Sequence, residues 1–231
     1  MATALLIHGL SASAASMWRF REWLEADGWD VSDHSPLGHG GRGAATDYTI
    51  ASQVADLLAT GPWDLVVGHS LGGTIATVAT TQRPGWTARL VLVDPAWYLA
   101  AGIQEEIRAD ELAELELTRE RLEVGHPEWD ARDIDAKLDG IAGVLPEAVR
   151  GAFDDNPVWD VRAEALALPI PTLLLTGDPT VFTLLEPVDA VRAVAANDHI
   201  AWSAIPGAGH APHRDRPAET RERLIGWLRG D

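Results

Sequence analysis

The chain has 231 residues, of which 46% are hydrophobic, with no cysteine and a formal net charge of −17. This length and composition suit one domain with a full core, and the absence of cysteine excludes disulfides and thiolate metal sites. Nucleic acid and anionic membranes are excluded as expected partners, because the acidity would repel both. We expect a cytoplasmic protein, since no apolar run reaches the length of a membrane span and the first residues lack the basic start of a secretory signal.

Short apolar runs typical of buried strands alternate with amphipathic runs typical of helices. The strand-like runs are residues 4–7, 29–31, 65–67, 90–93, 172–175 and 200–205. Apolar side chains three or four residues apart predict helices near residues 17–24, 50–58, 74–80 and 224–228. This alternation predicts an α/β fold, with a mostly parallel sheet of about six strands and helices on both faces.

The alternation is interrupted between residues 96 and 168. This segment is acidic and helical in character, and Pro127, Pro146 and Pro157 divide it into several short helices. An insertion after a strand of a parallel sheet lies over the edge where such sheets bind ligands. We therefore expect residues 1–95 and 169–231 to form the core and residues 96–168 to form a small helical cap and crossover. The alternative is an ordinary helical crossover with an extension.

A nucleophile elbow follows the third strand-like run. Gly68-His69-Ser70-Leu71-Gly72 has the G-x-S-x-G spacing and lies between an apolar run and a helix-like stretch. The turn from strand to helix is so tight that glycines are needed two residues on either side of the nucleophile. Ser70 is therefore expected to project above the sheet as the nucleophile. The N–H of Leu71, at the positive end of the helix, would face an oxyanion formed there.

A serine needs a base to take its proton, so we expect a histidine on a later loop at the same edge of the sheet. His210 follows the last strand-like run among small residues. Its rivals are His199, which precedes that run, and His213, which lies nearer the final helix. An acid must orient the imidazole, and Asp178 and Asp94 both end strands at the required edge. We favour Asp178, because its strand lies nearest the loop of His210, with Asp94 as the alternative.

The order Ser70, Asp178, His210 is that of the catalytic triad in the α/β-hydrolase fold. The chain resembles the α/β-hydrolase superfamily over nearly its whole length, and is similar to its small bacterial esterase-like members with a helical cap. The resemblance implies a sheet without the family's first two strands, with His8-Gly9 as the oxyanion loop. By the same resemblance, the N–H of Leu10 joins that of Leu71 in the oxyanion hole.

Five residues are expected to border the substrate pocket. Trp18, close to the oxyanion loop, and Trp97, at the root of the cap, are placed to line a pocket for an acyl or alcohol group. Leu112 and Leu115 of the cap would add an apolar lid. The resemblance adds His39, since family members often carry a Gly-His-Gly loop at the border of the pocket.

One motif points to a different chemistry. Residues 38–43 spell G-x-G-x-x-G, the dinucleotide fingerprint, but they follow the second strand-like run and open no predicted helix. His34, His39 and His126 also lack the spacing of metal ligands. We therefore expect no cofactor and no metal.

These features predict a serine hydrolase that cleaves a small to medium neutral carboxylic ester or lactone through an acyl-enzyme intermediate. One alternative is a C–C bond hydrolase or lyase of the same fold, in which the serine and histidine move protons and Arg19, Arg21 and Arg42 bind an anionic substrate. A second alternative is a non-hydrolytic small-molecule sensor. The expected partner is a small-molecule substrate, and the sequence leaves the oligomeric state open.

Overall fold

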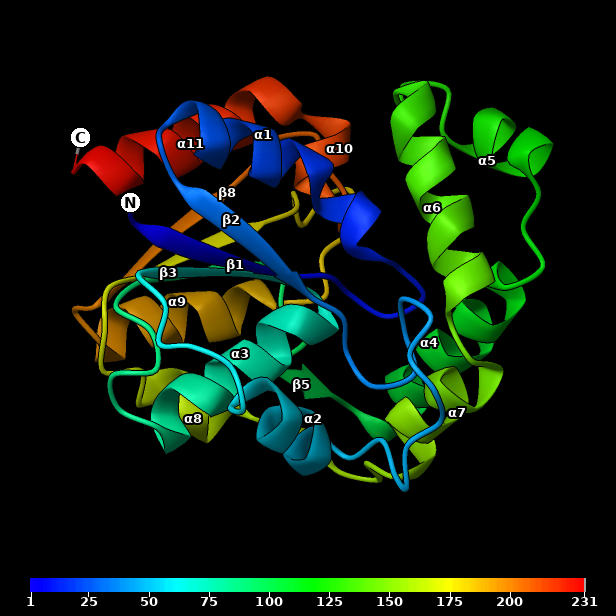
Figure 1. The fold of residues 1–231 in the computed structure, drawn as a ribbon, viewed down its shortest axis with the longest axis horizontal. Coiled ribbons are helices and arrows are strands. Elements are labelled where there is room, and N and C mark those ends of the chain that lie inside the picture. Colours follow the sequence, from blue (N-terminus) through cyan, green and yellow to red (C-terminus); the bar gives the residue numbers. More distant parts are fainter. Residues whose placement is uncertain (231) are drawn as a thin grey trace.

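A computed structural model describes residues 1–230 and shows a central sheet of six parallel strands (Figure 1). The strands are β1 (Thr3–Ile7), β2 (Asp30–His34), β3 (Leu65–His69), β4 (Leu90–Val93), β7 (Thr172–Thr176) and β8 (Ile200–Ala204). Their order across the sheet is β2-β1-β3-β4-β7-β8. Each of the six predicted strands is present, and the predicted α/β fold is confirmed.

Parallel strands need crossover connections, and helices supply them on both faces of the sheet. One face carries the 3-10 turn η1 (Ala14–Met17) with α1 (Trp18–Ala26), and the short α10 (Pro212–Asp215) with α11 (Pro217–Arg229). The other face carries α2 (Ile50–Leu57), α3 (Leu71–Gln82), α8 (Arg162–Leu166) and α9 (Pro187–Ala196). Figure 1 shows the first group above the sheet and the second group below it. The sheet is therefore shielded from solvent on both sides.

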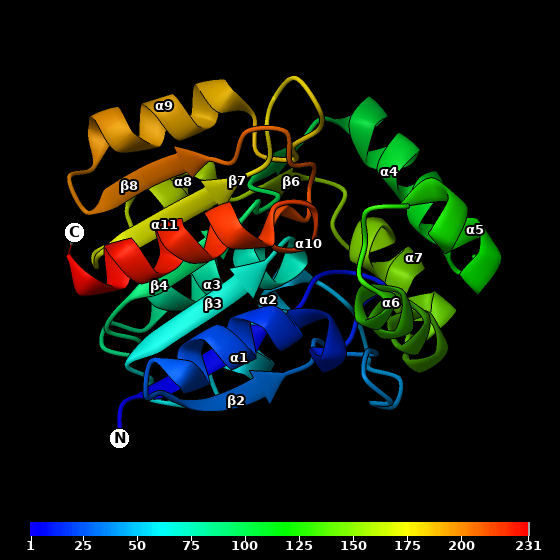
Figure 2. The same ribbon diagram turned by 90° about the horizontal axis from the view of Figure 1, so that it is seen from above.

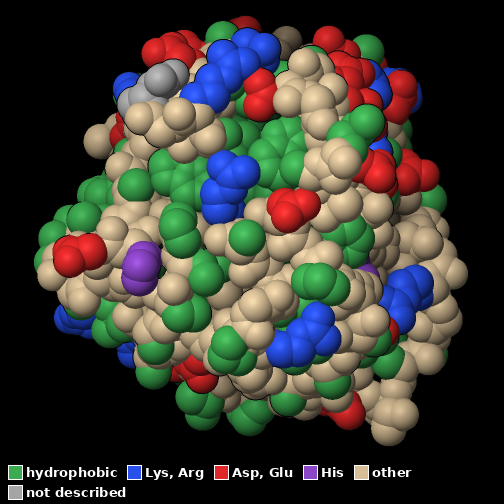
Figure 3. Space-filling view, turned by 60° about the vertical axis from the view of Figure 1, so that its left-hand side comes forward, with side chains coloured by type: hydrophobic (Ala, Val, Ile, Leu, Met, Phe, Trp, Pro, Cys, Tyr) green, Lys and Arg blue, Asp and Glu red, His purple; other side chains and the backbone are tan. Residues whose placement is uncertain are grey.

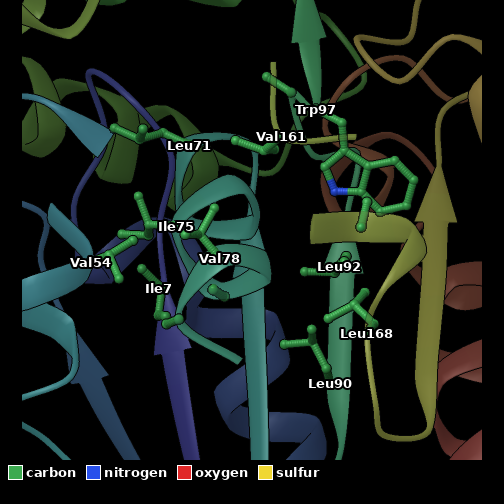
Figure 4. Close-up of a cluster of buried hydrophobic side chains, with 14 of the residues drawn as sticks. Ile7, Val54, Leu71, Ile75, Val78, Leu90, Leu92, Trp97, Val161 and Leu168 are labelled. Carbon is green, nitrogen blue, oxygen red and sulfur yellow. The ribbon is translucent and has the colours of Figure 1, made fainter. Parts of the chain in front are cut away.

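Successive residues of a strand point to opposite faces, and so they enter two separate hydrophobic clusters. In β1, Ile7 belongs to the cluster on the side of α2 and α3, whereas Leu6 belongs to the cluster on the side of α1 and α11. Figure 4 shows the first cluster, in which Ile75 of α3 and Val54 of α2 lie near Ile7. These side chains are fully buried. Packing on both faces fixes the strand ends from which the candidate site is built.

The chain between β4 and β7 leaves the sheet and forms four helices at its carboxyl edge. We call them the inserted helices: α4 (Ala101–Glu114), α5 (Arg119–Gly125), α6 (Ala131–Gly143) and α7 (Pro146–Asp154). Two short antiparallel strands, β5 (Tyr98–Leu99) and β6 (Trp159–Asp160), pair where this segment departs and returns. Figure 2 shows the strands pointing toward the inserted helices. The ends of the strands that carry the candidate residues thus lie beneath these helices.

The surface away from the inserted helices carries charges of both signs. Figure 3 shows acidic and basic side chains dispersed among hydrophobic ones on this face. No helix within residues 1–230 is long and apolar enough to cross a membrane.

Candidate active site

The G-x-S-x-G segment forms the tight turn between β3 and α3 that its spacing predicts. Ser70 has φ 52° and ψ −119°, a strained backbone for a residue with a side chain. A Cβ added at Gly68 would lie 2.5 Å from the carbonyl oxygen of Gly72, so that only glycine fits there. Ser70 borders a cavity, as the predicted nucleophile should.

The end of β1 lies against this turn. A Cβ on Gly72 would lie 2.3 Å from the carbonyl oxygen of Ile7, and one on Gly9 would lie 2.9 Å from Cβ of Ser70. Leu10 follows directly and borders the cavity. The side chain of Leu71 is buried in the core (Figure 4), and its residue opens α3. Both amides predicted for the oxyanion hole therefore belong to segments in contact with Ser70, and their role stays a prediction.

Backbone strain collects at the ends of three neighbouring strands. Among residues 1–230, the non-glycine residues with positive φ are Ser11 (49°), Ser70 (52°) and Asp94 (43°). They follow β1, β3 and β4, which are adjacent in the sheet. Each such residue costs on the order of 1–3 kcal/mol, and strain of this kind clusters at functional sites. This strain makes the carboxyl edge of these three strands the candidate functional site.

Asp94 holds the imidazole of His210. Nδ1 of His210 lies 2.6 Å from Oδ2 of Asp94, a residue with 0% exposure. The carboxylate also accepts a hydrogen bond from the N–H of Leu184 at 2.9 Å and one from the hydroxyl of Thr183. Asp94 is thus fixed from two sides. With Nδ1–H donating to this carboxylate, Nε2 of His210 is the nitrogen available as a base.

His210 also contacts the turn that carries Ser70. The carbonyl oxygen of His210 accepts a hydrogen bond from Nε2 of His69 at 3.0 Å, and the two ring centroids lie 4.8 Å apart. Ser70 and His210 border the same cavity. The two rivals do not border it, because His213 is fully buried against Phe20 and His199 lies exposed at the start of β8. The serine and the histidine that the sequence selects therefore border one cavity, and no hydrogen bond joins their side chains within residues 1–230.

Asp178 makes no hydrogen bond to His210 in the described chain, and the expectation that it orients the imidazole is wrong. Its Oδ1 accepts from the N–H and the hydroxyl of Thr180 at 2.8 and 2.7 Å, and its Oδ2 accepts from the N–H of Gly207 at 2.9 Å. The hydrogen bond from Gly207 is the main reason why the pKa of Asp178 lies below its ordinary value, with those from Thr180 adding to it. Asp178 thus joins the loops that follow β7 and β8.

The order of the strands explains this correction. β4 lies between β3, which leads to Ser70, and β7, which leads to Asp178. The loop after β8 reaches back across β7, so that His210 contacts His69 at the end of β3. The strand-end carboxylate that the imidazole meets there is Asp94. Although β7 is the neighbour of β8 in the sheet, the imidazole of His210 therefore meets the carboxylate at the end of β4.

The cavity that Ser70 and His210 border has a volume of about 610 Å³ and lies between the sheet edge and the inserted helices. Its apolar walls include Leu10, Ile107, Leu117, Leu122, Phe182 and Leu184. Its polar walls include Glu111, Lys137 and Arg214. The volume and the mixed walls suit a small molecule. Within residues 1–230, no group of three or more His, Asp or Glu side chains is arranged to hold a metal ion.

The two tryptophans predicted for the pocket do not border this cavity. Nε1 of Trp18 donates to Asp133 at 2.8 Å, on the outer side of the contact between α1 and α6. Trp97 is 1% exposed and donates from Nε1 to the hydroxyl of Thr77 at 3.1 Å (Figure 4). Both indoles are used for packing, and the tryptophan that borders the cavity is Trp129.

The two leucines predicted for the lid also lie off the cavity. Helix α4 presents Ile107, Glu111 and Glu114 to it, with spacings of four and three residues that place them on one face of the helix. Leu112 and Leu115 follow these residues by one position and are only half-buried. The face of α4 that borders the cavity is therefore partly acidic and not the apolar lid that we predicted.

His39 lies behind the oxyanion loop and does not border the cavity. Its Nε2 accepts a hydrogen bond from the N–H of Ser11 at 3.3 Å, and its Nδ1 donates to the carbonyl of Leu37 at 2.9 Å. Burial lowers the pKa of His39 to about 4, and burial, with a contribution from His39, lowers the pKa of His8 to about 3. Both imidazoles are therefore neutral at pH 7 and support the loop that carries Leu10.

The fold matches that of known hydrolases. A family model described as the alpha/beta hydrolase family matches residues 4–223. The chain belongs to this family. This alpha/beta hydrolase is similar to lipase LipV of Mycobacterium tuberculosis, with 31% identity over 186 residues, 73% of this chain and 69% of the lipase.

Two solved structures share the fold of this alpha/beta hydrolase. An N-formylmaleamic acid deformylase from Pseudomonas putida S16 matches with a TM-score of 0.80 and 22% identity, covering 97% of this chain and 91% of that chain. An esterase from Exiguobacterium antarcticum matches with a TM-score of 0.72 and 16% identity, covering 99% of this chain and 92% of that chain. Family membership and these relatives support a hydrolase.

Proposed function

We propose that this alpha/beta hydrolase is a serine hydrolase that cleaves a small to medium carboxylic ester or lactone through an acyl-enzyme intermediate. The observation that carries the proposal is the bond between His210 and the buried carboxylate of Asp94, at the cavity bordered by a strained Ser70. The names of a lipase and an esterase among the relatives support an ester as the substrate.

In the first half of the proposed reaction, Oγ of Ser70 attacks the ester carbonyl while Nε2 of His210 takes the hydroxyl proton. Asp94 keeps the ring oriented and stabilises the imidazolium. The N–H groups of Leu10 and Leu71 bind the oxyanion, each contributing on the order of 3–4 kcal/mol to the transition state. His210 then protonates the leaving alkoxide, and the acyl group remains on Ser70.

In the second half, His210 takes a proton from water as the water oxygen attacks the acyl carbonyl. The tetrahedral intermediate collapses, the bond to Oγ of Ser70 breaks, and His210 returns the proton to the serine. An ester yields a carboxylic acid and an alcohol, and a lactone yields a hydroxy acid. The chain's own residues supply every proton transfer, so the proposal includes no cofactor.

We assign the inserted helices the role of a cap over this site. Residues of α4, α5 and α6 border the cavity opposite the strand ends, among them Ile107, Leu122 and Lys137. A cavity of about 610 Å³ between the strand ends and these helices suits a small molecule. The division into a core of residues 1–95 and 169–231 and a cap of residues 96–168 belongs to this proposal.

The arginines that would favour a lyase with an anionic substrate are engaged elsewhere. Each of the three makes an ion pair, and none of them borders the cavity. The pairs, with their shortest distances, are Arg19 with Asp133 at 2.6 Å, Arg21 with Asp33 at 2.5 Å and Arg42 with Asp56 at 2.6 Å. The geometry therefore favours ester hydrolysis over this alternative.

A panel of 4-nitrophenyl esters with acyl chains of two to eight carbons and a panel of γ- and δ-lactones test the proposal. We expect turnover of at least one class by the wild type and none above background by Ser70→Ala. Binding without turnover would instead support a sensor. Cleavage of a β-diketone, with no cleavage of any ester or lactone, would support the C–C bond hydrolase.

A further inference from the structure

The cavity of Ser70 is bordered by a buried guanidinium that has no anionic partner. Arg214, in α10, is 7% exposed and borders the same cavity as Ser70 and His210. Within residues 1–230, its guanidinium makes no hydrogen bond and no ion pair, and its Nε is shielded from solvent without an acceptor. A buried charge lowers stability unless an opposite charge and hydrogen bonds compensate it. A ligand with an anionic group would supply both.

The carboxylates that attract Arg214 already serve other groups. Asp133, Asp215 and Glu114 each exert an electrostatic attraction on it, yet burial outweighs them and lowers the pKa of Arg214. Each is engaged by a closer donor. The donors are Arg19 for Asp133 at 2.6 Å, the N–H of Gly209 and Nε1 of Trp129 for Asp215 at 2.7 and 2.9 Å, and Lys137 for Glu114. Arg214 therefore remains the cation without a bonded partner at this wall.

The charge of Arg214 acts on the imidazole that contacts the proposed base. Arg214 follows His210 by four residues, and it is close enough to His69 and His213 that its charge, together with their burial, helps to hold the pKa of both imidazoles well below the ordinary value. The ring of His69 in turn lies 4.8 Å from that of His210. A group bound to Arg214 would thus lie in the same cavity as the ester carbonyl at Ser70.

An aromatic ring holds the guanidinium in place. Cζ of Arg214 lies 4.9 Å from the centroid of the Trp129 ring. A cation–π contact of this kind leaves the N–H donors of the guanidinium free to form the paired bonds that suit a carboxylate. Since Trp129 also borders the cavity, the two side chains form one wall of it.

The acidic residues of the cavity do not oppose an anion strongly. Burial raises the pKa of Glu111, so its carboxyl takes up a proton more readily than an exposed one, and its Oε2 has no hydrogen-bond partner within residues 1–230. Four further carboxylates border the cavity. Asp110 and Glu128 are exposed, where water screens their charge, whereas Glu114 pairs with Lys137 and Asp215 accepts from the N–H of Gly209 and Nε1 of Trp129.

We infer that Arg214 binds a carboxylate of the substrate, so that the ester or lactone cleaved at Ser70 carries a negative charge on its acyl or its alcohol part. This inference rests on the proposed function for the same cavity. It replaces the neutral substrate expected from the sequence, because one buried cation inside the cavity outweighs a net charge of −17 spread over the chain. Arg214 is the buried one of the two arginines at the cavity, Arg216 being exposed, and one buried guanidinium suits a singly charged carboxylate.

Two pairs of esters test the inference, one for each side of the scissile bond. The acyl pair is 4-nitrophenyl hydrogen adipate and 4-nitrophenyl hexanoate, and the alcohol pair is 3-acetoxybenzoate and its methyl ester. In the wild type we expect a higher kcat/KM for the charged member of at least one pair. Arg214→Gln should reduce this preference about tenfold to a hundredfold, the range of a charge-assisted hydrogen bond.

Two further variants control this result. Arg214→Lys keeps the charge without the planar fork and should retain part of the preference. Arg223→Gln removes the same charge from an exposed position on α11 and should leave the preference unchanged. A wild type that prefers the neutral member of both pairs overturns the inference while the proposed hydrolysis stands, and this outcome needs no variant to fold.

Binding to Ser70→Ala separates the inference from the proposed function. If no ester is cleaved, the proposed function fails, but calorimetry with hexanoate and hexan-1-ol still tests the site. Hexanoate binding about tenfold tighter or more supports a carboxylate at Arg214. Equal binding of the two compounds overturns it.

Discussion

Nδ1 of His210 and Oδ2 of Asp94 lie 2.6 Å apart, joined by a hydrogen bond between the loop after β8 and the end of β4. The carboxylate of Asp94 also accepts a hydrogen bond from the N–H of Leu184 at 2.9 Å. A carboxylate held in this way keeps the imidazole in one tautomer and stabilises its charged form. This pair decides which acid belongs to the proposed triad, and it leads to the first prediction.

Asp94→Asn should lower kcat for a 4-nitrophenyl ester by about 10⁴, because an amide at this position favours the wrong tautomer of His210. Asp178→Asn should reduce kcat far less, since Asp178 bonds to Gly207 and Thr180 and acts through the loop. Steady-state kinetics of the two variants, matched in charge, make the comparison. The reverse ranking would return the role of the acid to Asp178.

Gly72→Ala should destabilise the protein by about 1–3 kcal/mol or more, because the new Cβ would lie 2.3 Å from the carbonyl oxygen of Ile7 in a packed core. Gly226→Ala is the matched control, since a Cβ there meets nothing within 4 Å on helix α11. This control should stabilise the protein by about 0.5–1 kcal/mol. Urea unfolding measures both changes. An equal effect of the two substitutions would contradict the close packing of β1 against the nucleophile turn.

Asp133→Asn should cost about 3–5 kcal/mol of stability, because it leaves the buried guanidinium of Arg19 without its counter-charge. Asp135→Asn, two residues along α6, breaks only an exposed pair with Arg119 and should change stability little. The two variants differ in burial and not in chemistry. Similar midpoints of urea unfolding for both would show that the contact between α1 and α6 does not depend on this pair.

Stability should fall as the pH is lowered from 7 toward 4. Burial lowers the pKa of His39 to about 4 in the folded chain. The imidazole of the unfolded chain therefore takes up a proton near pH 6.5, whereas that of the folded chain stays neutral until the pH is near 4. The stabilisation is complete above the unfolded pKa and is lost as the pH falls toward the folded one, at about 1.4 kcal/mol for each pH unit. His39→Gln keeps an acceptor for Ser11 and should flatten this dependence between pH 6.5 and 4.5 in urea unfolding. An unchanged slope would show that other groups dominate it.

Much of the fold could be predicted from the sequence because the signals are local. Short continuous apolar runs located all six strands of the sheet, and the G-x-S-x-G spacing located the strained turn at Ser70. His210 was identifiable because a loop after the last strand must return to the carboxyl edge. The small β5–β6 pair has only two residues in each strand and carries no detectable period.

The acid and the pocket could not be predicted because they depend on distances between loops. Asp94 and Asp178 both end strands at the same edge, and only the path of the loop after β8 brings His210 to Asp94. The pocket depends on which face of α4 turns inward, and that face carries Ile107 and Glu111 instead of Leu112. The one signal for Arg214 was its spacing of four residues from His210.

Covalent labelling with a fluorophosphonate, followed by mass spectrometry of the peptides, tests the central assignment most directly. We expect one phosphonyl adduct, on Ser70, with labelling abolished in Ser70→Ala and strongly slowed in Asp94→Asn. An adduct on another residue, or equal labelling of wild type and Ser70→Ala, would contradict it.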